Sequence, residues 1–155
     1  MSTKPTDIIL ISLFNACARI ANVDALRIGK KAFFQAQPEY LNNTFVLHSA
    51  LDMFIKCDDI VSAEKIFDKK SKKNIIDYGA MMKGFNRIGQ PLRTWSLFQQ
   101  MKIQSIVPNH IIFVLVINAC SQIGIVSICR TIVDQIPVSF LNICQIANSL
   151  IDMWV

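Results

Sequence analysis

The segment Phe14-Asn15-Ala16-Cys17-Ala18-Arg19-Ile20 has a second copy, Ile117-Asn118-Ala119-Cys120-Ser121-Gln122-Ile123, 103 residues further along the chain. Self-similarity at a fixed spacing indicates a repeat architecture. A second pair, Leu-Asp-Met-Phe at 51–54 and Ile-Asp-Met-Trp at 151–154, recurs after 100 residues, and a weaker echo joins 65–67 to 96–98 after 31 residues. The longer period therefore contains smaller units.

The smaller units each begin just ahead of an apolar helical stretch. They are 7–43, 44–74, 75–109, 110–143 and a partial unit 144–155, after an N-terminal extension of residues 1–6. Apolar residues recur three and four positions apart, as at Ile60, Ala63, Ile66 and Phe67, which is the helical period and not strand alternation. Turns at 21–22, 58–59, 89–90 and 124 divide each unit in two. The sequence therefore predicts a stack of helical hairpins that bury their faces against one another.

The composition excludes some classes of protein. Of 155 residues, 52% are apolar and 17% are charged, which excludes intrinsic disorder. Sixteen Lys and Arg against eleven Asp and Glu leave a net charge of +5, which favours acidic partners such as nucleic acid. The charged fraction is below the usual globular share, so we expect a fragment of a longer protein.

Residue types that bind metals or catalyse reactions are not arranged for either task. The cysteines are odd in number, lie in apolar helical contexts and form no C-x-x-C pair, so we expect reduced, buried thiols. The two histidines, His48 and His110, have no metal-ligand spacing and belong to no H-E-x-x-H motif. We therefore expect no enzyme activity, no metal and no cofactor.

The stretch 111–129 lacks charge over nineteen residues, as a membrane span would. Its equivalent 103 residues earlier, 8–26, contains Arg19 and Asp24. Two homologous stretches should have the same structure, and 8–26 is a charged hairpin. We therefore predict that 111–129 forms two buried helices around a turn at Gly124, with no membrane partner. The run 8–14 is preceded by one lysine and adjoins Asp7, unlike a signal peptide.

The units resemble pentatricopeptide repeats, in the subclass that alternates long, short and standard repeats. The long type is similar to 15–18 and 118–121, the short type to 51–57 with 63–68, and the standard type to 80–85 through 97–101. Unequal unit lengths also fit this subclass better than tetratricopeptide repeats. The resemblance implies an all-α fold, an α-solenoid of helix-turn-helix repeats in a right-handed superhelix. It also implies that the first helices bind single-stranded RNA, one base per repeat.

In this family the fifth and last residues of each unit address one base. The fifth residues are Ile11, His48, Gly79, Val114 and Asn148, and the last residues are Asn43, Asn74, Asn109 and Ile143. Isoleucine and valine offer no donor or acceptor, and glycine has no side chain. Only His48 with Asn74 and Gly79 with Asn109 are pairs that could read a base, so we expect poor base specificity.

The second residue of each unit is apolar, and the resemblance implies that it packs against the faces of bases. These residues are Ile8, Phe45, Ile76 and Ile111. Stacking on an aromatic side chain is worth about 1–3 kcal/mol, so Phe45 would contribute most. The alternative is that all four are the first buried position of a helix.

The thirteenth residue is a cation in three units and an amide in the fourth: Arg19, Lys56, Arg87 and Gln122. One cation per first helix would form a line suited to phosphates, and Lys83 lies one turn before Arg87 on the same side. The alternative is an ordinary solvated helix face. For the dense run Lys69-Lys70-Ser71-Lys72-Lys73 we favour a solvated linker over an RNA contact.

The sequence thus predicts a single-stranded RNA-binding module from a longer protein that acts in organelle RNA processing, modification or C-to-U editing, with partner proteins. A mitochondrial or other organellar location is implied by the resemblance only, since we see no clear transit peptide. The H-x-E and C-x-x-C elements of a zinc deaminase are absent from these 155 residues.

The alternative function is a protein interaction scaffold without RNA binding. RNA binding that falls steeply with added salt would distinguish the two. We also expect self-association through exposed terminal repeats, near Trp154, because terminal repeats normally carry a polar outer face.

Overall fold

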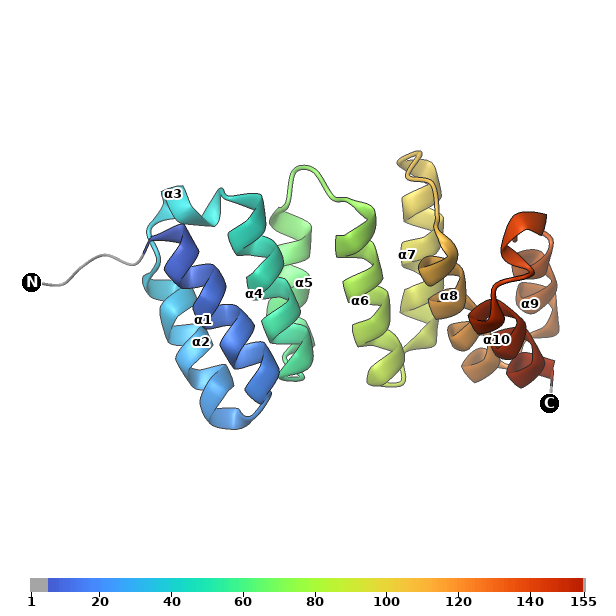
Figure 1. The fold of residues 1–155 in the computed structure, drawn as a ribbon, viewed down its shortest axis with the longest axis horizontal. Coiled ribbons are helices and arrows are strands. Elements are labelled where there is room, and N and C mark those ends of the chain that lie inside the picture. Colours follow the sequence, from blue (N-terminus) through green and yellow to red (C-terminus); the bar gives the residue numbers. More distant parts are fainter. Residues whose placement is uncertain (1–5, 155) are drawn as a thin grey trace, which may run out of the picture. The chain divides into compact units, whose positions relative to one another are not determined.

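The computed structural model describes residues 6–154, which are helical segments joined by short turns, with no strand in that range (Figure 1). These residues divide into two compact units, of which the first ends at Lys73 and the second begins at Asn74. The predicted extension lies outside the described residues except for Thr6. The all-α prediction is confirmed.

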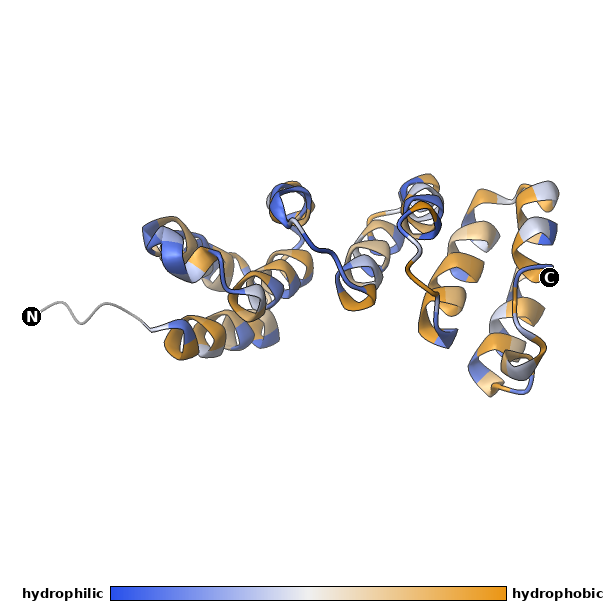
Figure 2. Ribbon diagram, turned by 90° about the horizontal axis from the view of Figure 1, so that it is seen from above, coloured by the Kyte–Doolittle hydropathy of each residue, from blue (hydrophilic) through white to orange (hydrophobic). Residues whose placement is uncertain are grey.

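The first unit contains two hairpins and a short connecting helix. Its helices are α1 (Asp7–Ile20), α2 (Val23–Gln35), α3 (Pro38–Leu41), α4 (Thr44–Lys56) and α5 (Ile60–Lys69). Helix α1 packs against α2 and along α4, and α4 also packs against α5. Seen from above, α1 and α4 form one row while α2 and α5 lie behind them (Figure 2). The first helices of the two repeats in this compact unit are therefore neighbours.

The second unit repeats this pattern and adds one further first helix. Its elements are α6 (Ile75–Arg87), α7 (Pro91–Ile103), α8 (His110–Ile123), α9 (Val126–Val133), the 3-10 helix η1 (Val138–Phe140) and α10 (Cys144–Trp154). Helix α8 packs against α6, α7, α9 and α10. It is the central helix of this unit, which explains why its sequence is the most apolar.

Asparagine and aspartate side chains begin most of the longer helices. Each accepts a hydrogen bond from a backbone N–H of the first turn, which satisfies a donor that the helix itself leaves unpaired. The residues are Asn22 for α2, Asn43 for α4, Asp59 for α5, Asn74 for α6 and Asn109 for α8. Asn74 and Asp77 also form a reciprocal capping box. These caps place the starts of the helices.

The turns inside the hairpins lie where the sequence predicts them, and each contains a residue in the left-handed region. The φ angles are 49° at Ala21, 62° at Asp58, 70° at Gly89 and 69° at Gly124. Glycine adopts this conformation without strain, whereas alanine does so at a cost. The turn at Gly124 divides 111–129 into α8 and α9, as predicted. Within residues 6–154, no helix is long and apolar enough to cross a membrane.

The core of the first unit lies between its two rows of helices. Phe14 and Phe54 are fully buried, and the Phe33 ring meets that of Phe54 edge-on at 5.7 Å between centroids. The end of the Met53 side chain from α4 lies directly over Gly29 of α2. Any larger residue at position 29 would therefore require the Met53 side chain to move.

The core of the second unit combines apolar packing with a buried polar network. Phe98 is buried, and the centroid of its ring lies 6.0 Å from that of Phe113. The Thr94 hydroxyl lies 2.7 Å from Asn86 Oδ1 and 3.1 Å from the Met82 carbonyl oxygen. Asn86 Nδ2 donates to the Leu115 carbonyl oxygen at 2.8 Å. This network joins α6, α7 and α8.

The cysteines are free thiols, and the prediction that they are buried holds for three of the five. Cys17, Cys120 and Cys129 are buried, Cys57 is half-buried and Cys144 is exposed. The prediction was wrong for Cys144, which is the first residue of α10 and is exposed.

Candidate nucleic-acid interface

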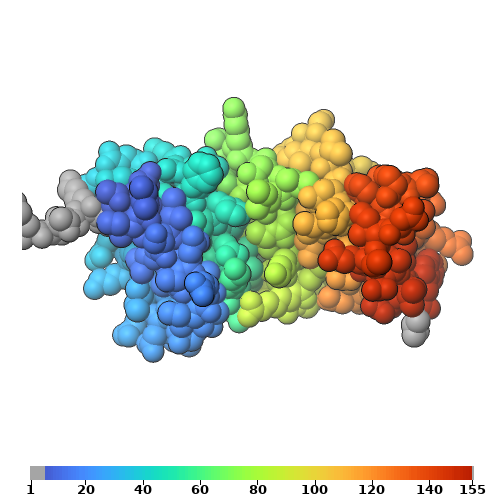
Figure 3. Space-filling model, in the orientation of Figure 1, coloured from blue at the N-terminus to red at the C-terminus, as the bar shows by residue number. Residues whose placement is uncertain are grey.

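In each predicted repeat, the second and thirteenth residues lie on the same face of the first helix. Eleven residues correspond to just over three full turns, so the two side chains point in similar directions about 16 Å apart along the axis. In the first compact unit this face belongs to α1 and α4, whose surfaces lie side by side in Figure 3. In the second unit it belongs to α6, α8 and α10.

The apolar second residues lie in the first turn of these helices and are exposed. The exposed fractions are 72% for Ile8, 73% for Phe45, 59% for Ile76 and 52% for Ile111. The alternative that they are buried core positions is therefore wrong. The core begins one or two residues later, at Leu10, Val46, Asp77 and Ile112. Each of these four helices thus has a large apolar side chain in contact with solvent at this position.

The fifth residues, one turn further along, are less accessible. Ile11, His48, Gly79 and Val114 are half-buried, and Asn148 is exposed. A Cβ added to Gly79 would lie 3.4 Å from Ile112 Cδ1, an ordinary contact, so packing does not demand glycine there. His48 lies one turn after Phe45. Among these five residues, it alone has a ring with polar atoms.

Three of the four last residues of the repeats are helix caps, a role that the base-reading prediction missed. Asn43 Oδ1 accepts from the Phe45 N–H at 2.9 Å, Asn74 Oδ1 from the Asp77 N–H at 3.0 Å, and Asn109 Oδ1 from the Ile112 N–H at 3.0 Å. Asparagine directly before an apolar helical run is a capping signal that could have been recognised in the sequence. Ile143, which precedes α10, is half-buried and has no polar side chain.

In these caps the side-chain oxygen accepts from the backbone, and the side-chain amide nitrogen is a separate donor. Asn43 Nδ2 donates to Asp7 Oδ2 at 3.1 Å, which joins the start of α4 to the start of α1. No such bond from the amide nitrogens is present for Asn74 and Asn109 among the described residues. These two asparagines therefore present amide N–H donors at the start of α6 and α8.

The cations lie at the opposite end of the same helix face. Arg19, Arg87 and the one-turn-earlier Lys83 are exposed, and so is Gln122. Lys56 is half-buried, and its Nζ lies 2.7 Å from Asp52 Oδ2. Arg19, Lys56 and Arg87 belong to the last turns of α1, α4 and α6, where a positive charge opposes the negative end of the helix dipole.

The lysine run after α5 is not simply a solvated linker. Lys69 and Lys72 are exposed, but only 4% of Lys70 is accessible to solvent. Lys73 Nζ donates to the Lys70 carbonyl oxygen and lies 5.1 Å from the centre of the Phe67 ring. Sequence reasoning could not see the burial of Lys70, because that depends on packing with other parts of the first compact unit.

No group of three or more His, Cys, Asp or Glu side chains within residues 6–154 is placed to hold a metal ion. His48 and His110 belong to the first helices α4 and α8. Within each compact unit, the first helices combine exposed apolar side chains, amide donors and cations on one face. Such a surface can contact the bases and the phosphates of an extended nucleic acid.

Comparison of the sequence finds pentatricopeptide repeat-containing proteins of Arabidopsis thaliana. A chloroplastic one is 33% identical over 124 residues, 79% of this chain, and another chloroplastic one is 26% identical over 152 residues, 97% of this chain. The chain spans only 15% and 18% of the lengths of these two relatives. No model of a known protein family matches the chain.

Comparison of the structure finds the crystal structure of the pentatricopeptide repeat protein PPR10 in complex with an 18-nt psaJ RNA element. The TM-score is 0.52 at 16% sequence identity, over 94% of this chain and 28% of that protein. The likeness shows that the fold is an α-solenoid of helical repeats.

Proposed function

Because the homologues of this chain are pentatricopeptide repeat proteins, we propose that it binds single-stranded RNA through the exposed face of its first helices. The observation that carries the proposal is the exposure of Ile8, Phe45, Ile76 and Ile111 in the first turns of α1, α4, α6 and α8. Large apolar side chains at one equivalent position on each helix suit contact with the faces of successive bases.

The cations at the other end of the face would hold the phosphates. Lys83 and Arg87 are exposed on α6, one turn apart, and Arg19 is exposed on α1. Lys56 is a weaker candidate, because a phosphate would compete with the Asp52 carboxylate 2.7 Å away. We therefore infer that Arg19 and Lys83 are better placed than Lys56 to hold a phosphate.

Base recognition would use the amide groups of the capping asparagines. Asn74 and Asn109 can donate from Nδ2, so they would favour base edges that carry acceptors, whereas Asn43 already donates to Asp7. His48 with Asn74 and Gly79 with Asn109 remain the proposed reading pairs. Ile11, Val114 and Ile143 have nothing to donate, and Asn148 is the fifth residue of a partial unit. We propose low base specificity.

The finer assignments are also proposals. We propose that the repeats alternate long, short and standard types and that the chain is part of a longer protein without catalytic function in these residues. The homologues include chloroplastic and mitochondrial proteins, which supports a role in organelle RNA processing, modification or C-to-U editing together with partner proteins. The exposed Ile151 and Trp154 on α10 support self-association.

The test measures binding of a labelled, mixed-sequence single-stranded RNA of about 12 nucleotides, longer than one base per repeat requires, at about 50 and 200 mM salt. The variant Lys83→Ala with Arg87→Ala should bind more weakly. Its slope of log affinity against log salt should fall by about 0.7 for each phosphate that the variant no longer neutralises. A matched control, Lys31→Ala with Arg130→Ala, removes two exposed cations from other surfaces and should bind as the parent does.

A third variant tests the apolar contacts. Phe45→Ala removes an exposed ring, so it should leave the helical circular dichroism signal unchanged while the RNA affinity falls by about 1–3 kcal/mol. Equal losses of RNA affinity in the Lys83 and Lys31 double variants would mean that RNA is attracted by general charge and not by this face. No RNA binding by the folded parent would contradict the proposal and leave the scaffold alternative.

A further inference from the structure

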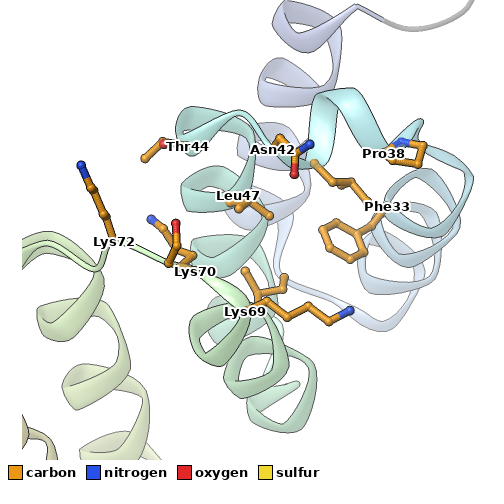
Figure 4. Close-up of a pocket in the computed structure, with 11 residues that line it drawn as sticks. Phe33, Pro38, Asn42, Thr44, Leu47, Lys69, Lys70 and Lys72 are labelled. Atoms are coloured by element: carbon orange, nitrogen blue, oxygen red, sulfur yellow. The ribbon is translucent and has the colours of Figure 1, made fainter.

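A cavity of about 550 Å³ lies within the first unit, between α2, α3, α4 and the end of α5. Its walls are apolar side chains of α2 to α5 and the lysine run that follows α5 (Figure 4). Ligand pockets in proteins typically measure about 300–1,000 Å³. The cavity has the size of a binding site, and the proposed RNA contacts do not use it.

The floor of the cavity is apolar. It is formed by Phe33, Leu41, Leu47 and Ile66, from four different helices. The Phe33 ring already contacts those of Phe14, Phe34 and Phe54, at 6.3, 5.8 and 5.7 Å between centroids. These contacts occupy ring surface that a base would need for stacking, so the floor is better suited to an aliphatic or small apolar side chain.

The rim of the cavity is positive. Lys69, Lys70 and Lys72 line it, and no Asp or Glu is present among the described residues that do so. In Figure 4, Lys69 runs below Phe33, while Lys72 lies on the other side, near Thr44. Thr44 is the first residue of α4, so the positive end of that helix dipole also faces the rim. An acidic group is therefore the complementary partner.

A second, smaller cavity of about 110 Å³ extends this surface along α5. It shares Phe33, Ile66 and Lys69 with the first cavity and adds the aromatic rings of Phe34 and Phe54. It also adds Lys65, one turn before Lys69 on the same helix face. The two cavities together form a surface that is longer than one side chain. Its floor is apolar, and lysines line its rim.

We propose that this surface binds an acidic, apolar peptide segment of a partner protein. Apolar side chains of the segment enter the cavity above Leu47 and Ile66, and Asp or Glu side chains pair with Lys69 and Lys72. Asn42, Thr44 and Ser71, which also line the cavity, supply hydrogen-bonding groups for the backbone of the segment. An RNA strand would use the lysines but would leave the apolar floor unfilled, so the peptide is the better match.

The test uses a library of short, capped, fluorescein-labelled peptides in which Asp or Glu alternates with Leu, Ile or Phe. Two matched libraries replace the acidic residues by Lys or the apolar residues by Ala. Fluorescence anisotropy should detect binding of acidic-apolar members only. Methyl NMR signals of Leu41, Leu47 and Ile66 should shift on binding, which places the peptide in the cavity.

The variant Lys69→Glu with Lys72→Glu reverses two exposed charges at the rim and should weaken the binding of acidic-apolar peptides at least about tenfold. The control Lys31→Glu with Arg130→Glu reverses two exposed charges elsewhere and should bind as the parent does. Circular dichroism checks that both variants stay folded.

Several outcomes would overturn the proposal. One is that no acidic-apolar peptide shifts the methyl signals of Leu47 and Ile66. Another is equal binding by the rim variant and the parent. A third is RNA that shifts the same methyl signals and loses affinity in the rim variant, which would assign the cavity to phosphates. The RNA-binding proposal is tested separately by Lys83→Ala with Arg87→Ala, so the two can fail independently.

Discussion

The two compact units join their helices with different polar contacts. In the first unit, Lys30 Nζ lies 2.6 Å from Asp59 Oδ2, which joins α2 to the start of α5, and Asn43 donates to the Asp7 carboxylate. In the second unit, the neutral side chains of Thr94 and Asn86 join α6, α7 and α8. Equivalent repeats can therefore be held by charged groups in one place and by neutral groups in another.

This difference matters for function because it decides which polar groups a ligand can use. Lys56 and Asn43 of the first unit are engaged by Asp52 and Asp7. The amide nitrogen of Asn109 in the second unit faces no comparable carboxylate among the described residues. Residues of the same type at equivalent positions thus differ in what they can bind.

The largest expected effects are core deletions, one in each unit. Phe54→Ala and Phe98→Ala each remove a fully buried ring and should lower the free energy of unfolding by about 3–5 kcal/mol. In a repeat array stability is mainly a sum of local terms, so each loss should stay within one unit. Hydrogen exchange measured by mass spectrometry should speed up in 7–69 for the first variant and in 75–154 for the second.

If either variant accelerates exchange evenly over both ranges, the two units unfold as one and do not differ in stability. Phe45→Ala is the control, because it removes an exposed ring from the same helix as Phe54. It should leave exchange in both ranges close to that of the parent.

The next effect is acid sensitivity of the first unit. Burial by itself raises the pKa of the Asp59 carboxyl, but hydrogen bonds from Lys30 and Ser62 outweigh it and hold the pKa below its ordinary value. A lowered pKa stabilises the folded state above the ordinary value of about 4, and this stabilisation is lost as the pH falls through the folded-state pKa. The first unit should therefore unfold before the second on acidification.

Asp59→Asn tests this mechanism, because asparagine keeps the cap of α5 and removes the charge. It should lower the free energy of unfolding by about 1–3 kcal/mol at neutral pH. It should also make the stability measured by urea unfolding depend less on pH between about pH 5 and pH 2. Thr94→Val is the matched change in the second unit, with a similar cost of about 1–3 kcal/mol and no change in pH dependence. An unchanged acid dependence in Asp59→Asn would show that other carboxylates control it.

A smaller effect separates two capping asparagines. Asp is as good a cap as Asn, so Asn109→Asp should change stability by less than about 0.5 kcal/mol. Asn43→Asp replaces a hydrogen bond to Asp7 with repulsion between two carboxylates and should cost about 1 kcal/mol. Thermal unfolding followed by circular dichroism measures both, and equal costs would mean that the Asn43–Asp7 bond contributes nothing.

The smallest effect concerns the thiols and leaves stability unchanged. Burial, together with the neighbouring Cys129, raises the pKa of Cys120 to about 12, and burial also raises the pKa of Cys17. Since the thiolate is the reactive form, these thiols should not react with iodoacetamide at about pH 8 in the folded protein. Mass spectrometry should find Cys144 alkylated first. Rapid modification of Cys120 would indicate local opening of α8 and α9.

Much of the fold could be predicted from the sequence. The spacing of 103 residues between two similar segments indicated repeats, and the turns at Asp58 and Gly124 lie where the polar breaks between apolar runs predict them. The apolar stretch 111–129 was identified as two helices because its equivalent, 8–26, carries charges. The turns rest on local spacing, which the helical period converts directly into structure, and the repeats rest on the similarity between distant copies.

The candidate site was harder to predict. Ile8 and Phe45 left two interpretations open, because one apolar residue in a first turn suits a core and an exposed contact equally well. Their exposure depends on which way the helix is rotated against its neighbours. The lysine run was expected to be a solvated linker, yet Lys70 is buried and three of its lysines line a cavity.

By itself, the sequence determined that the chain forms helical hairpins in repeats, because helix periods, caps and turns involve residues only a few positions apart. Tertiary structure alone decided which polar groups are already engaged and where the cavity lies. Asp7 and Asn43 are 36 positions apart, and the cavity joins Phe33 to Lys72. Such contacts arise only when the hairpins stack, and stacking determines which side of each helix remains exposed.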